Sequence, residues 1–477
     1  MAIQPPPQTA KEWLAIIQAE EGRRHLRDFI PLAWPIVEPT TPFMPNWHID
    51  AISEHLEAVS RGEIRNLLIN MPPRCAKSTI VSVMWPVWTW ATTPAFRWLF
   101  ASYALSLAIR DSLKCRRIIE SDWYQRHYGD MVQLAPDQNL KSRFENSARG
   151  YRYAVSVGSS VTGEGGDAIV VDDAHNAKMA GSALIRESTL DWWDQAISSR
   201  LNDPRTGCKV IVMQRLHERD LSAHVLEKGD YVHLCLPLEY EANTKCVTAL
   251  GWEDPRRLDG ELLWPERIGP TEVAQLKIAL GVYGYAGQYQ QRPTPRAGGT
   301  FQQAWMGKRY RTLPQMPQVI QAVDSAFKEG VANDYSVIAT WGTDGIGYYL
   351  INIWRDRVDF PGLIQAIRDQ AAAHAPSAIL VEDKASGQSA IQMLHRTTAL
   401  PVIAVAADGS KESRADLISP LFEAGRVYLP ESAEWLAAWI DEHVHFPRGA
   451  HDDQCDTTSY ALRYLSADRG GRIRFFD

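Results

Sequence analysis

The sequence lacks the features that mark several classes of protein. No two of its six cysteines are spaced as Cys-x-x-Cys, which argues against a zinc knuckle or a redox pair. The thiols are scattered over 477 residues, so the disulfide framework of a small secreted domain is not expected either. There is no internal repeat and no low-complexity tract. The first residues do not follow the charged-then-apolar pattern of a signal peptide, so secretion is not expected.

Excess basic charge is also missing. Acidic residues outnumber basic ones by 57 to 50, and the formal net charge is −7. A polyanion such as nucleic acid would have to bind a local basic patch, because the chain has no general positive field. Residues 78–96 carry no charge and are long enough to span a bilayer. Their two prolines and their position after a predicted strand favour a buried helix instead, and no membrane partner is expected.

The composition is that of a globular protein, with 45% hydrophobic and 22% charged residues, and the length suits two or three domains. In the first half, short β-rich runs alternate with helical patterns. This alternation indicates an α/β domain with a parallel sheet and helices on both faces. Strands are expected at residues 66–70, 97–102, 153–157, 168–171 and 209–213, with helices at 13–21 and 48–61 before the first strand.

A different pattern follows the Pro- and Gly-rich segment 288–300. Strands at 319–325, 336–342 and 347–354 form an antiparallel meander, followed by a helix at 361–373, a strand at 378–382, a helix from 388, a strand at 402–406, and helices at 412–424, 432–443 and 452–465. This order predicts an RNase H-like mixed sheet. We therefore expect a first domain over residues 1–290, a linker over 291–305 and a second domain over 306–477.

Residues 71–78, Met-Pro-Pro-Arg-Cys-Ala-Lys-Ser, lie between a predicted strand and a helical run. A phosphate-binding loop needs backbone N–H groups around the phosphates, a lysine that reaches them, and a Ser or Thr hydroxyl for Mg²⁺. Lys77 and Ser78 supply the last two, whereas Met71 and Ala76 stand where glycines are usual. An ordinary strand-to-helix turn with an exposed lysine is the alternative.

Residues 168–173, Ala-Ile-Val-Val-Asp-Asp, form a buried strand that ends in two carboxylates. This is the Walker B pattern, in which Asp172 would hold the metal and Asp173 would orient the attacking water. A solvated strand end is the alternative. Gln214 follows another strand and could sense the γ-phosphate, or it could belong to a polar connection. Trp47 and His48 lie where a purine could stack, although by themselves they fit ordinary packing equally well.

The second half places acidic residues where strands end and where the last helix begins. In an RNase H-like sheet the first and fourth strands are adjacent, so Asp324 and Glu382 would face each other. Carboxylates held together repel, which favours a divalent cation, and hard oxygen ligands suit Mg²⁺ or Mn²⁺. A solvated first helical turn is the alternative for the last helix. The further acids are Asp334, Asp452, Asp453 and Asp456, and Lys384, Lys411 and Arg414 either contact nucleic acid or are solvated surface.

Taken together, these motifs resemble those of the large terminase subunit of tailed bacteriophages. The resemblance rests on FMPNWHID, MPPRCAKS, VTGEGGDAIVVDDAH, VMQRLHERDL, YQQRPTPRAGGTF, VDSAFKEGVANDYS, VEDKASGQ, AGRVYLP and FPRGAHDDQCD, in this order. It implies a packaging ATPase that uses ATP and Mg²⁺, joined to an RNase H-like nuclease that cuts concatemeric viral DNA. It also implies double-stranded DNA, a portal protein and a small terminase subunit as partners, a ring of identical subunits, and the cytoplasm of an infected bacterium as the location.

The resemblance also assigns roles to individual positions. Lys77 and Ser78 match the phosphate-loop Lys and Ser, and Asp172 and Asp173 match the Walker B acids. Asp324, Glu382 and Asp453 match the nuclease acids, with Asp452 and Asp334 as auxiliary metal ligands. The other nucleotide-binding positions implied are Trp47, His48, Arg74, Cys75, Ala76, Thr79 and Gln214. A helicase-like or repair ATPase with an RNase H-like module is the main alternative, and a non-catalytic assembly scaffold is another.

Overall fold

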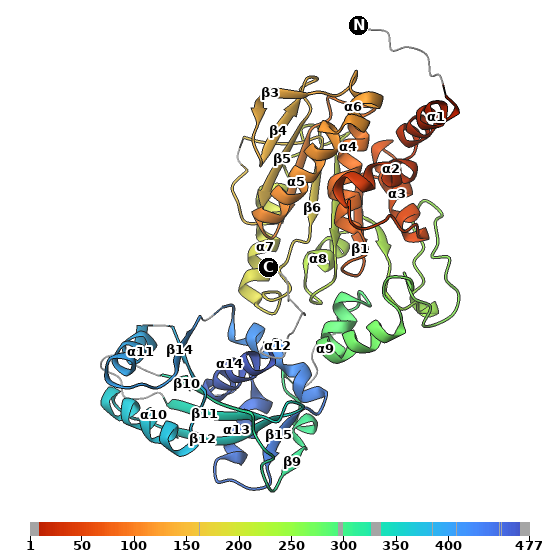
Figure 1. Cartoon of the computed structure of the whole chain (residues 1–477). Helices are drawn as coiled ribbons and strands as arrows, with labels where there is room; N and C mark the ends of the chain where they lie inside the picture. The colour runs from red at the N-terminus through yellow and green to blue at the C-terminus, as the bar shows by residue number, and fades with distance from the viewer. Residues whose placement is uncertain are drawn as a thin grey trace. The chain divides into compact units, whose positions relative to one another are not determined.

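The computed structural model describes residues 9–161, 163–293, 299–325, 335–383, 385–406, 408–447, 449 and 451–467 (Figure 1). The chain divides into two compact units, Met1–Val273 with Gly284–Thr294, and Ala274–Tyr283 with Pro295–Asp477. The helix α9 (Pro270–Gln288) has residues in both, and Gly281, with a φ of 65°, interrupts it. The expected boundaries near residues 290 and 306 stay a prediction, and residues 294–298 of the expected linker lie outside the described residues.

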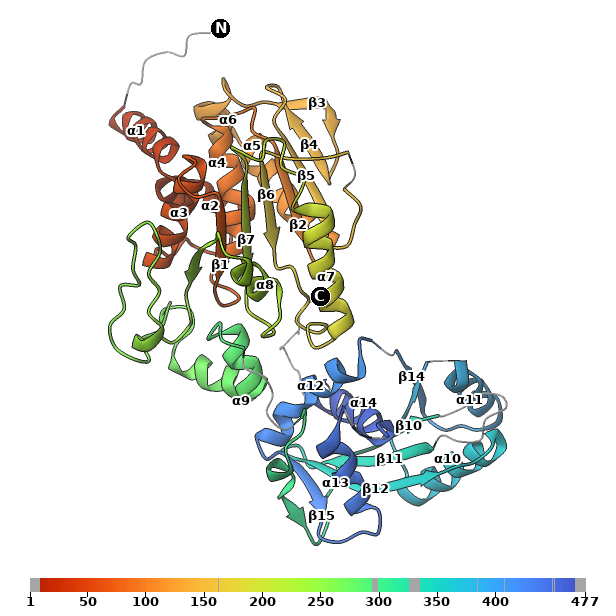
Figure 2. The same ribbon diagram turned by 180° about the vertical axis from the view of Figure 1, so that it is seen from behind.

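The first unit is built around an eight-stranded sheet with the order β3-β4-β5-β2-β6-β7-β1-β8 (Figures 1 and 2). Its strands are β1 (Asn66–Asn70), β2 (Trp98–Ser102), β3 (Leu134–Asn139), β4 (Arg143–Asn146), β5 (Tyr151–Ser156), β6 (Ala168–Asp172), β7 (Cys208–Met213) and β8 (Val232–Cys235). The six strands from β5 to β8 in this order pair in parallel. The predicted parallel α/β sheet is therefore confirmed.

The edge formed by β3, β4 and β5 differs from the prediction because these strands pair antiparallel. The connections are short, with residues 140–142 between β3 and β4 and residues 147–150 between β4 and β5. A parallel crossover needs about a dozen residues or more, so only an antiparallel hairpin fits here. The segment Leu134–Asn139 contains Pro, Asp and Asn, which are uncommon in strands, so the sequence pattern did not predict it.

Helices cover both faces of this sheet, as predicted. Figure 2 shows α7 and α8 on the near side and α2 to α5 behind. The helices are α1 (Ala10–Arg24), α2 (Leu26–Val37), α3 (Trp47–Ser60), the π-helical η1 (Thr79–Met84), α4 (Trp85–Trp90), α5 (Leu105–Glu120), α6 (Asp122–Tyr128), α7 (Ala183–Trp192), the π-helical η2 (Trp193–Ile197), α8 (Leu221–Lys228) and the short η3 (Ala242–Thr244). Every residue of α4 is buried, and no described helix is long and apolar enough to cross a membrane.

The second unit has a seven-stranded mixed sheet with the order β14-β13-β10-β11-β12-β15-β9. Its strands are β9 (Arg309–Tyr310), β10 (Gln318–Asp324), β11 (Ser336–Thr343), β12 (Tyr348–Asp356), β13 (Ala378–Glu382), β14 (Val402–Val405) and β15 (Val427–Pro430). The meander β10-β11-β12 is antiparallel, and β13 and β14 continue the sheet in parallel from β10. This confirms the RNase H-like arrangement, although β9 and β15 were too short to show a pattern in the sequence.

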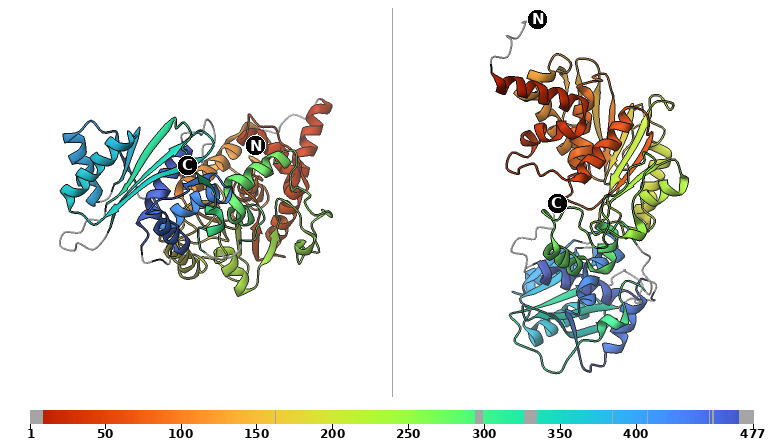
Figure 3. Two further views of the ribbon diagram at one scale, coloured as in Figure 1. Left: turned by 90° about the horizontal axis from the view of Figure 1, so that it is seen from below. Right: turned by 90° about the vertical axis from the view of Figure 1, so that its right-hand side faces the viewer.

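Two apolar layers hold this sheet between helices (Figure 3, left). Ile320 and Ala322 of β10 pack on the side of α14, whereas Val323 packs on the side of α10. This alternation follows from the two-residue period of a strand. The helices are η4 (Gln303–Met306), α10 (Phe360–His374), α11 (Ala385–Thr397), α12 (Lys411–Glu423), α13 (Leu436–His445) and α14 (Asp453–Ala467). The carboxyl end of β10 thus lies beside the start of α14, where the predicted acids gather.

Candidate functional sites

The loop after β1 has the backbone of an anion-binding turn without its usual glycines. Arg74 and Ala76 adopt φ values of 66° and 61°. Non-glycine residues reach this left-handed region at a cost of about 1 kcal/mol each, so the surrounding structure must enforce the turn. Lys77 and Ser78 begin the helical run and Thr79 begins η1, so the predicted loop residues lie together at the carboxyl end of β1. Burial raises the pKa of the Cys75 thiol to about 11, which keeps it protonated.

Asp172 lies at the end of β6 and is held by two hydroxyl groups. Ser78 Oγ donates to Asp172 Oδ1 at 2.9 Å, and Ser82 Oγ donates to Asp172 Oδ2 at 2.7 Å. Burial and the neighbouring charges of Asp173 and Asp111 raise the pKa of Asp172. Because these neighbouring carboxylates repel one another, a cation bound among them would be favoured. Ser78 and Asp172, the two predicted Mg²⁺ ligands, are therefore adjacent, and Ser82 is a partner that the sequence analysis missed.

Asp173 differs from Asp172 in both backbone and partners. Its φ is 48°, which turns the chain sharply after β6. Its Oδ2 lies 3.6 Å from Lys77 Nζ, and its Oδ1 accepts a hydrogen bond from the Gln214 backbone N–H at 3.4 Å. The structure thus brings Lys77, Asp173 and Gln214 to one edge of the sheet, where parallel strands end.

Polar atoms without partners also mark this edge. Among the described residues, the buried Ser102 Oγ and Gln214 Oε1 have no hydrogen-bond partner. Ser102 ends β2 and pairs in register with Asp172 of β6, while Gln214 follows β7. Buried polar groups are normally paired, so these atoms are suited to a polar ligand. The edge therefore fits a nucleotide with its Mg²⁺: a lysine, a hydroxyl, a carboxylate and unpaired polar atoms lie together.

His48 connects the predicted adenine side to the phosphate loop. Its Nε2 lies 3.2 Å from the carbonyl oxygen of Cys75, and burial lowers the pKa of the imidazole to about 4. The neutral ring therefore donates from Nε2, and Nδ1 has no partner within the described part of the chain. Trp47 stacks on Trp252 with a centroid distance of 6.2 Å and lines a cavity of about 540 Å³.

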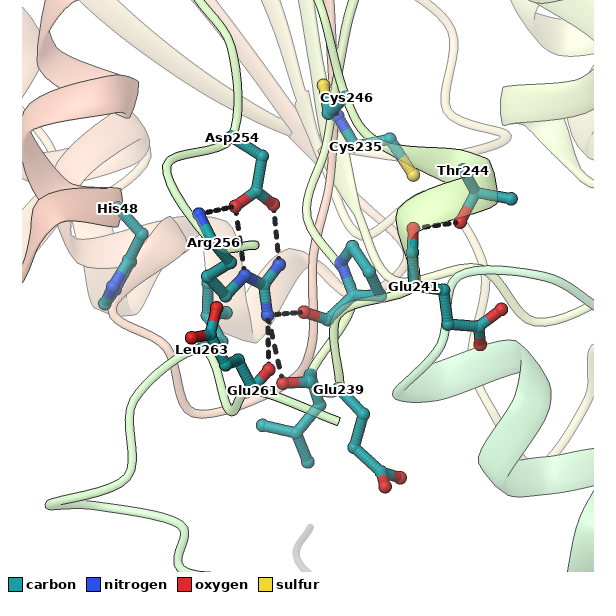
Figure 4. Close-up of polar contacts among 12 residues, drawn as sticks. His48, Cys235, Glu239, Glu241, Thr244, Cys246, Asp254, Arg256, Glu261 and Leu263 are labelled. Atoms are coloured by element: carbon teal, nitrogen blue, oxygen red, sulfur yellow. Dashed lines mark hydrogen bonds and ion pairs between the residues drawn. The ribbon is translucent and has the colours of Figure 1, made fainter. Parts of the chain in front are cut away.

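Arg256, which the sequence analysis did not single out, organises the wall of this cavity (Figure 4). Its guanidinium donates to Asp254 Oδ1 at 3.1 Å and to Asp254 Oδ2 at 2.8 Å. One further nitrogen donates to the carbonyl oxygens of Pro237, Leu238 and Glu261 at 3.0 to 3.2 Å. The same guanidinium lies 5.3 Å from the centroid of Trp47. Its partners lie up to 19 residues away in sequence, with no local motif, so sequence inspection offers no signal for them.

The second group of predicted residues lies at the carboxyl ends of β10 and β13. Val323 pairs in register with Val381, so Asp324 and Glu382 follow side by side on neighbouring parallel strands. Burial and the charges of Asp456, Asp453 and Glu382 raise the pKa of Asp324 to about 8. Burial and the charges of Glu442 and Asp452 raise the pKa of Asp453 to about 6. The structure thus brings Asp324, Glu382 and Asp453 into one electrostatic group.

Cations of the chain already pair with the acids around the start of α14. Lys411 Nζ lies 2.6 Å from Asp452 Oδ1 and 2.9 Å from Asp456 Oδ2, and Arg414 Nη2 lies 2.5 Å from Asp456 Oδ1. Asp456, one of the acids that the sequence places at the start of the last helix, is buried and makes the largest charge contribution at Asp324. Tyr460 donates to Glu382 Oε1 at 2.6 Å.

No three His, Cys, Asp or Glu side chains converge closely enough to hold a metal ion within the described ranges. Asp334 lies outside the described residues, as does Lys384. The donors that do gather are all carboxylates, which suit Mg²⁺ or Mn²⁺, and the raised pKa of Asp324 reflects a deficit of positive charge. The chemistry of the cluster therefore fits a divalent cation, although its acids are paired with Lys411, Arg414 and Tyr460, and Arg355 lies 3.9 Å from Asp453.

Comparison with known families identifies the second unit. Residues 321–465 match the family described as "Terminase RNaseH-like domain". This segment is similar to terminase RNase H-like domains. The match confirms the predicted resemblance to large terminase subunits, and the acids Asp324, Glu382, Asp452 and Asp453 all lie within the matched residues.

Solved structures of the large terminase from a thermophilic bacteriophage share the fold of the chain. One is 11% identical with a TM-score of 0.53, covering 87% of this chain and 99% of that chain. Its complex with ADP is 10% identical with a TM-score of 0.55, covering 86% and 98%. Its complex with ATP-γ-S is 11% identical with a TM-score of 0.51, also covering 86% and 98%. No curated protein sequence matches the chain.

Proposed function

We propose that this protein is the large subunit of a viral DNA-packaging motor, which hydrolyses ATP to move double-stranded DNA into a procapsid and cleaves concatemeric DNA. The observation that carries the proposal is that one chain combines a segment similar to terminase RNase H-like domains with a strand-end loop whose Ser78 is hydrogen-bonded to the strand-end Asp172. The likeness to the large terminase of the thermophilic bacteriophage, which was solved with ADP and with ATP-γ-S, supports the nucleotide as ligand.

In the first unit, the nucleotide phosphates would lie on the loop of residues 71–78. Lys77 would bind the β- and γ-phosphates, and Ser78 and Asp172 would hold Mg²⁺, which neutralises the developing phosphate charge when bound. Asp173 would orient the attacking water once Lys77 turns from it to the phosphates, and Gln214, whose backbone already contacts Asp173, would sense the γ-phosphate. Arg74, Cys75, Ala76 and Thr79 complete the loop, and Trp47 and His48 would border the base.

In the second unit, Asp324, Glu382 and Asp453 would hold Mg²⁺ or Mn²⁺, with Asp452 and Asp334 as auxiliary ligands. Two such ions activate water and stabilise the leaving oxygen of a phosphodiester. The chain's own contribution is to hold the acids close. Asp324 and Glu382 are fixed by neighbouring strands, and Tyr460 orients Glu382 by its hydrogen bond.

The proposed partners follow from packaging. They are double-stranded DNA, a portal protein, a small terminase subunit and further copies of this chain in a ring on the procapsid. The expected location is the cytoplasm of the infected bacterium.

Separate loss of the two activities tests the proposal. Lys77→Ala should abolish ATP hydrolysis and leave metal-dependent DNA cleavage, whereas Glu382→Ala should do the reverse. Matched controls are Lys141→Ala, at an exposed turn residue, and Glu431→Ala, at an exposed acid paired with Arg311. If one variant abolished both activities while it stayed folded by circular dichroism, two independent sites would be excluded. Strand separation of a duplex would favour the helicase-like alternative.

A further inference from the structure

The ammonium of Lys411 lies within the cluster of acidic side chains at the start of α14 in the second unit. Lys411 is the first residue of α12, and its Nζ contacts both Asp452 Oδ1 and Asp456 Oδ2 at 2.6 and 2.9 Å. In the sequence, these two acids lie before and after Asp453, the predicted metal ligand. The charge of Lys411 also reaches further, because it opposes the rise in pKa at both Asp324 and Asp453.

Arg414, one turn further along α12, has a different environment. Its side chain is only 3% exposed, and besides Asp456 it contacts the carbonyl oxygen of Gly409 at 3.2 Å and lies 5.2 Å from the Tyr460 ring. This is a fixed structural contact, because breaking it would also remove a buried guanidinium from its carbonyl and ring contacts. The Lys411 side chain is 37% exposed, against 3% for Arg414, so its ammonium can turn to solvent with a smaller loss of packing. One cation of the pair is therefore fixed, and the other is free to leave.

We propose that Lys411 is an exchangeable counter-cation of the nuclease site. In the metal-free chain its ammonium neutralises Asp452 and Asp456, and it withdraws when a divalent cation binds to the neighbouring carboxylates. The inference rests on the proposed metal-dependent nuclease. It adds a positioning residue, Lys411, whose ammonium holds Asp452 and Asp456 when no metal is bound.

The exchange follows from charge. Without a cation, five carboxylates, those of Asp324, Glu382, Asp452, Asp453 and Asp456, would repel one another at the start of α14. A lysine relieves this repulsion with a single charge on a flexible stem, whereas a divalent cation brings two charges and binds several oxygens directly. An ammonium and a divalent cation among the same carboxylates would repel each other, so the two would occupy the cluster in turn. Lys411 therefore competes with the metal and weakens its binding.

A titration with Mn²⁺ tests this competition. Mn²⁺ binding to the full-length protein, without DNA or nucleotide, is followed by the electron paramagnetic resonance signal of the free ion. Lys411→Met removes the charge and keeps the apolar stem, and it should bind Mn²⁺ about five- to tenfold more tightly, the effect of one partly exposed ion pair. Lys411→Arg should remain close to the wild type. Lys308→Met, at an exposed lysine of the same unit, is the matched control.

Thermal unfolding supplies a second readout. In EDTA, Lys411→Met should unfold at a lower temperature than the wild type, and saturating Mn²⁺ should remove the difference. Unchanged or weaker Mn²⁺ binding in Lys411→Met would overturn the inference. Asp324→Asn separates this failure from that of the proposed function: it should abolish the tight Mn²⁺ binding of the second unit, and retention of that binding would show that the metal site itself lies elsewhere.

Discussion

Lys77 Nζ lies 3.6 Å from Asp173 Oδ2, so the lysine that should bind phosphate contacts the acid that should activate water. Both roles cannot be performed while the two charges are paired. In the proposed function, nucleotide binding would therefore draw Lys77 towards the phosphates and free Asp173. The pair would keep the catalytic carboxylate occupied until ATP is in place.

The two residues should therefore fail in different ways. Lys77→Ala should weaken ATP binding at least tenfold and abolish hydrolysis, because it removes a charge that contacts the phosphates. Asp173→Asn should bind ATP at least as tightly as the wild type and lose hydrolysis by about 10²-fold or more, the contribution of a general base. Fluorescent-nucleotide titration and phosphate release would measure the two effects. Equal loss of binding in both variants would argue against the assignment of Asp173 as the base.

The left-handed conformation of Ala76 predicts that glycine would be tolerated at this position. Ala76 has a φ of 61°, which glycine adopts without steric cost. Ala76→Gly should therefore raise the free energy of unfolding by up to about 1 kcal/mol and retain ATP hydrolysis. Ala91→Gly, at a residue with a φ of −61°, should instead lower it by about 1 kcal/mol. Denaturant unfolding would compare them, and destabilisation by Ala76→Gly would show that the turn is not strained.

The Arg256 cluster predicts a large loss of stability on substitution. Asp254 is 1% exposed, and removing the guanidinium would leave this buried carboxylate with only the backbone N–H of residue 256 as a donor. The carbonyl oxygen of Pro237 would also lose its side-chain donor, whereas those of Leu238 and Glu261 keep backbone donors. Arg256→Ala should lower the stability of the first unit by about 3–5 kcal/mol, the cost of breaking a buried ion pair. Arg256→Lys should lose almost as much stability as Arg256→Ala, because lysine lacks the planar guanidinium that donates to several acceptors at once.

Arg311 provides the contrast to Arg256. Its side chain is 83% exposed and pairs with Glu431 at the surface. Arg311→Ala should cost no more than about 1 kcal/mol. Differential scanning calorimetry would measure both variants, and similar effects would contradict the structural role of Arg256.

His443 predicts a loss of stability in acid. Burial lowers the pKa of its imidazole to about 3, and the ring is held neutral between the Trp439 carbonyl and the Thr458 hydroxyl. Because this value lies below the unfolded-state pKa of about 6.5, the stabilisation is complete above pH 6.5 and is lost as the pH falls toward 3. Between pH 6.5 and 5 the loss should be about 2 kcal/mol.

Hydrogen exchange of amides in α13 and α14 measures this loss locally. His443→Gln should be less stable than the wild type at pH 7, and the difference between the two proteins should shrink by about 2 kcal/mol at pH 5, since glutamine does not titrate. A constant difference between the two proteins across this range would show that His443 does not titrate on unfolding.

The sequence predicted the elements whose patterns are local. The central strands β1, β6 and β13 are buried on both faces and read as continuous apolar runs, so they were located to within a residue. Asp324 and Glu382 could be placed together because each ends a strand of known order. In contrast, β3 is a polar edge strand, its neighbour β4 is a short and largely polar strand, and β9 has only two residues, so none of these carried a recognisable pattern.

Contacts between distant residues explain the remaining gaps. The contacts of Arg256, and the ion pairs of Asp456 with Lys411 and Arg414, depend on partners that only the fold brings together. Ser82 lies one helical turn after Ser78 and points to the same carboxylate, which the sequence could have indicated. The pairing of Lys77 with Asp173 had no signal, because a motif states which residues bind nucleotide and not what they contact without it.

The most direct test of the account is cleavage of supercoiled plasmid by the purified protein with Mg²⁺ or Mn²⁺, with wild type, Glu382→Ala and Lys77→Ala compared at equal concentration. We predict that the wild type and Lys77→Ala nick and linearise the plasmid, and that Glu382→Ala does not. Cleavage by Glu382→Ala at the wild-type rate, or its absence in folded wild-type protein with both metals, would contradict the assignment of a metal-dependent nuclease to this carboxylate group.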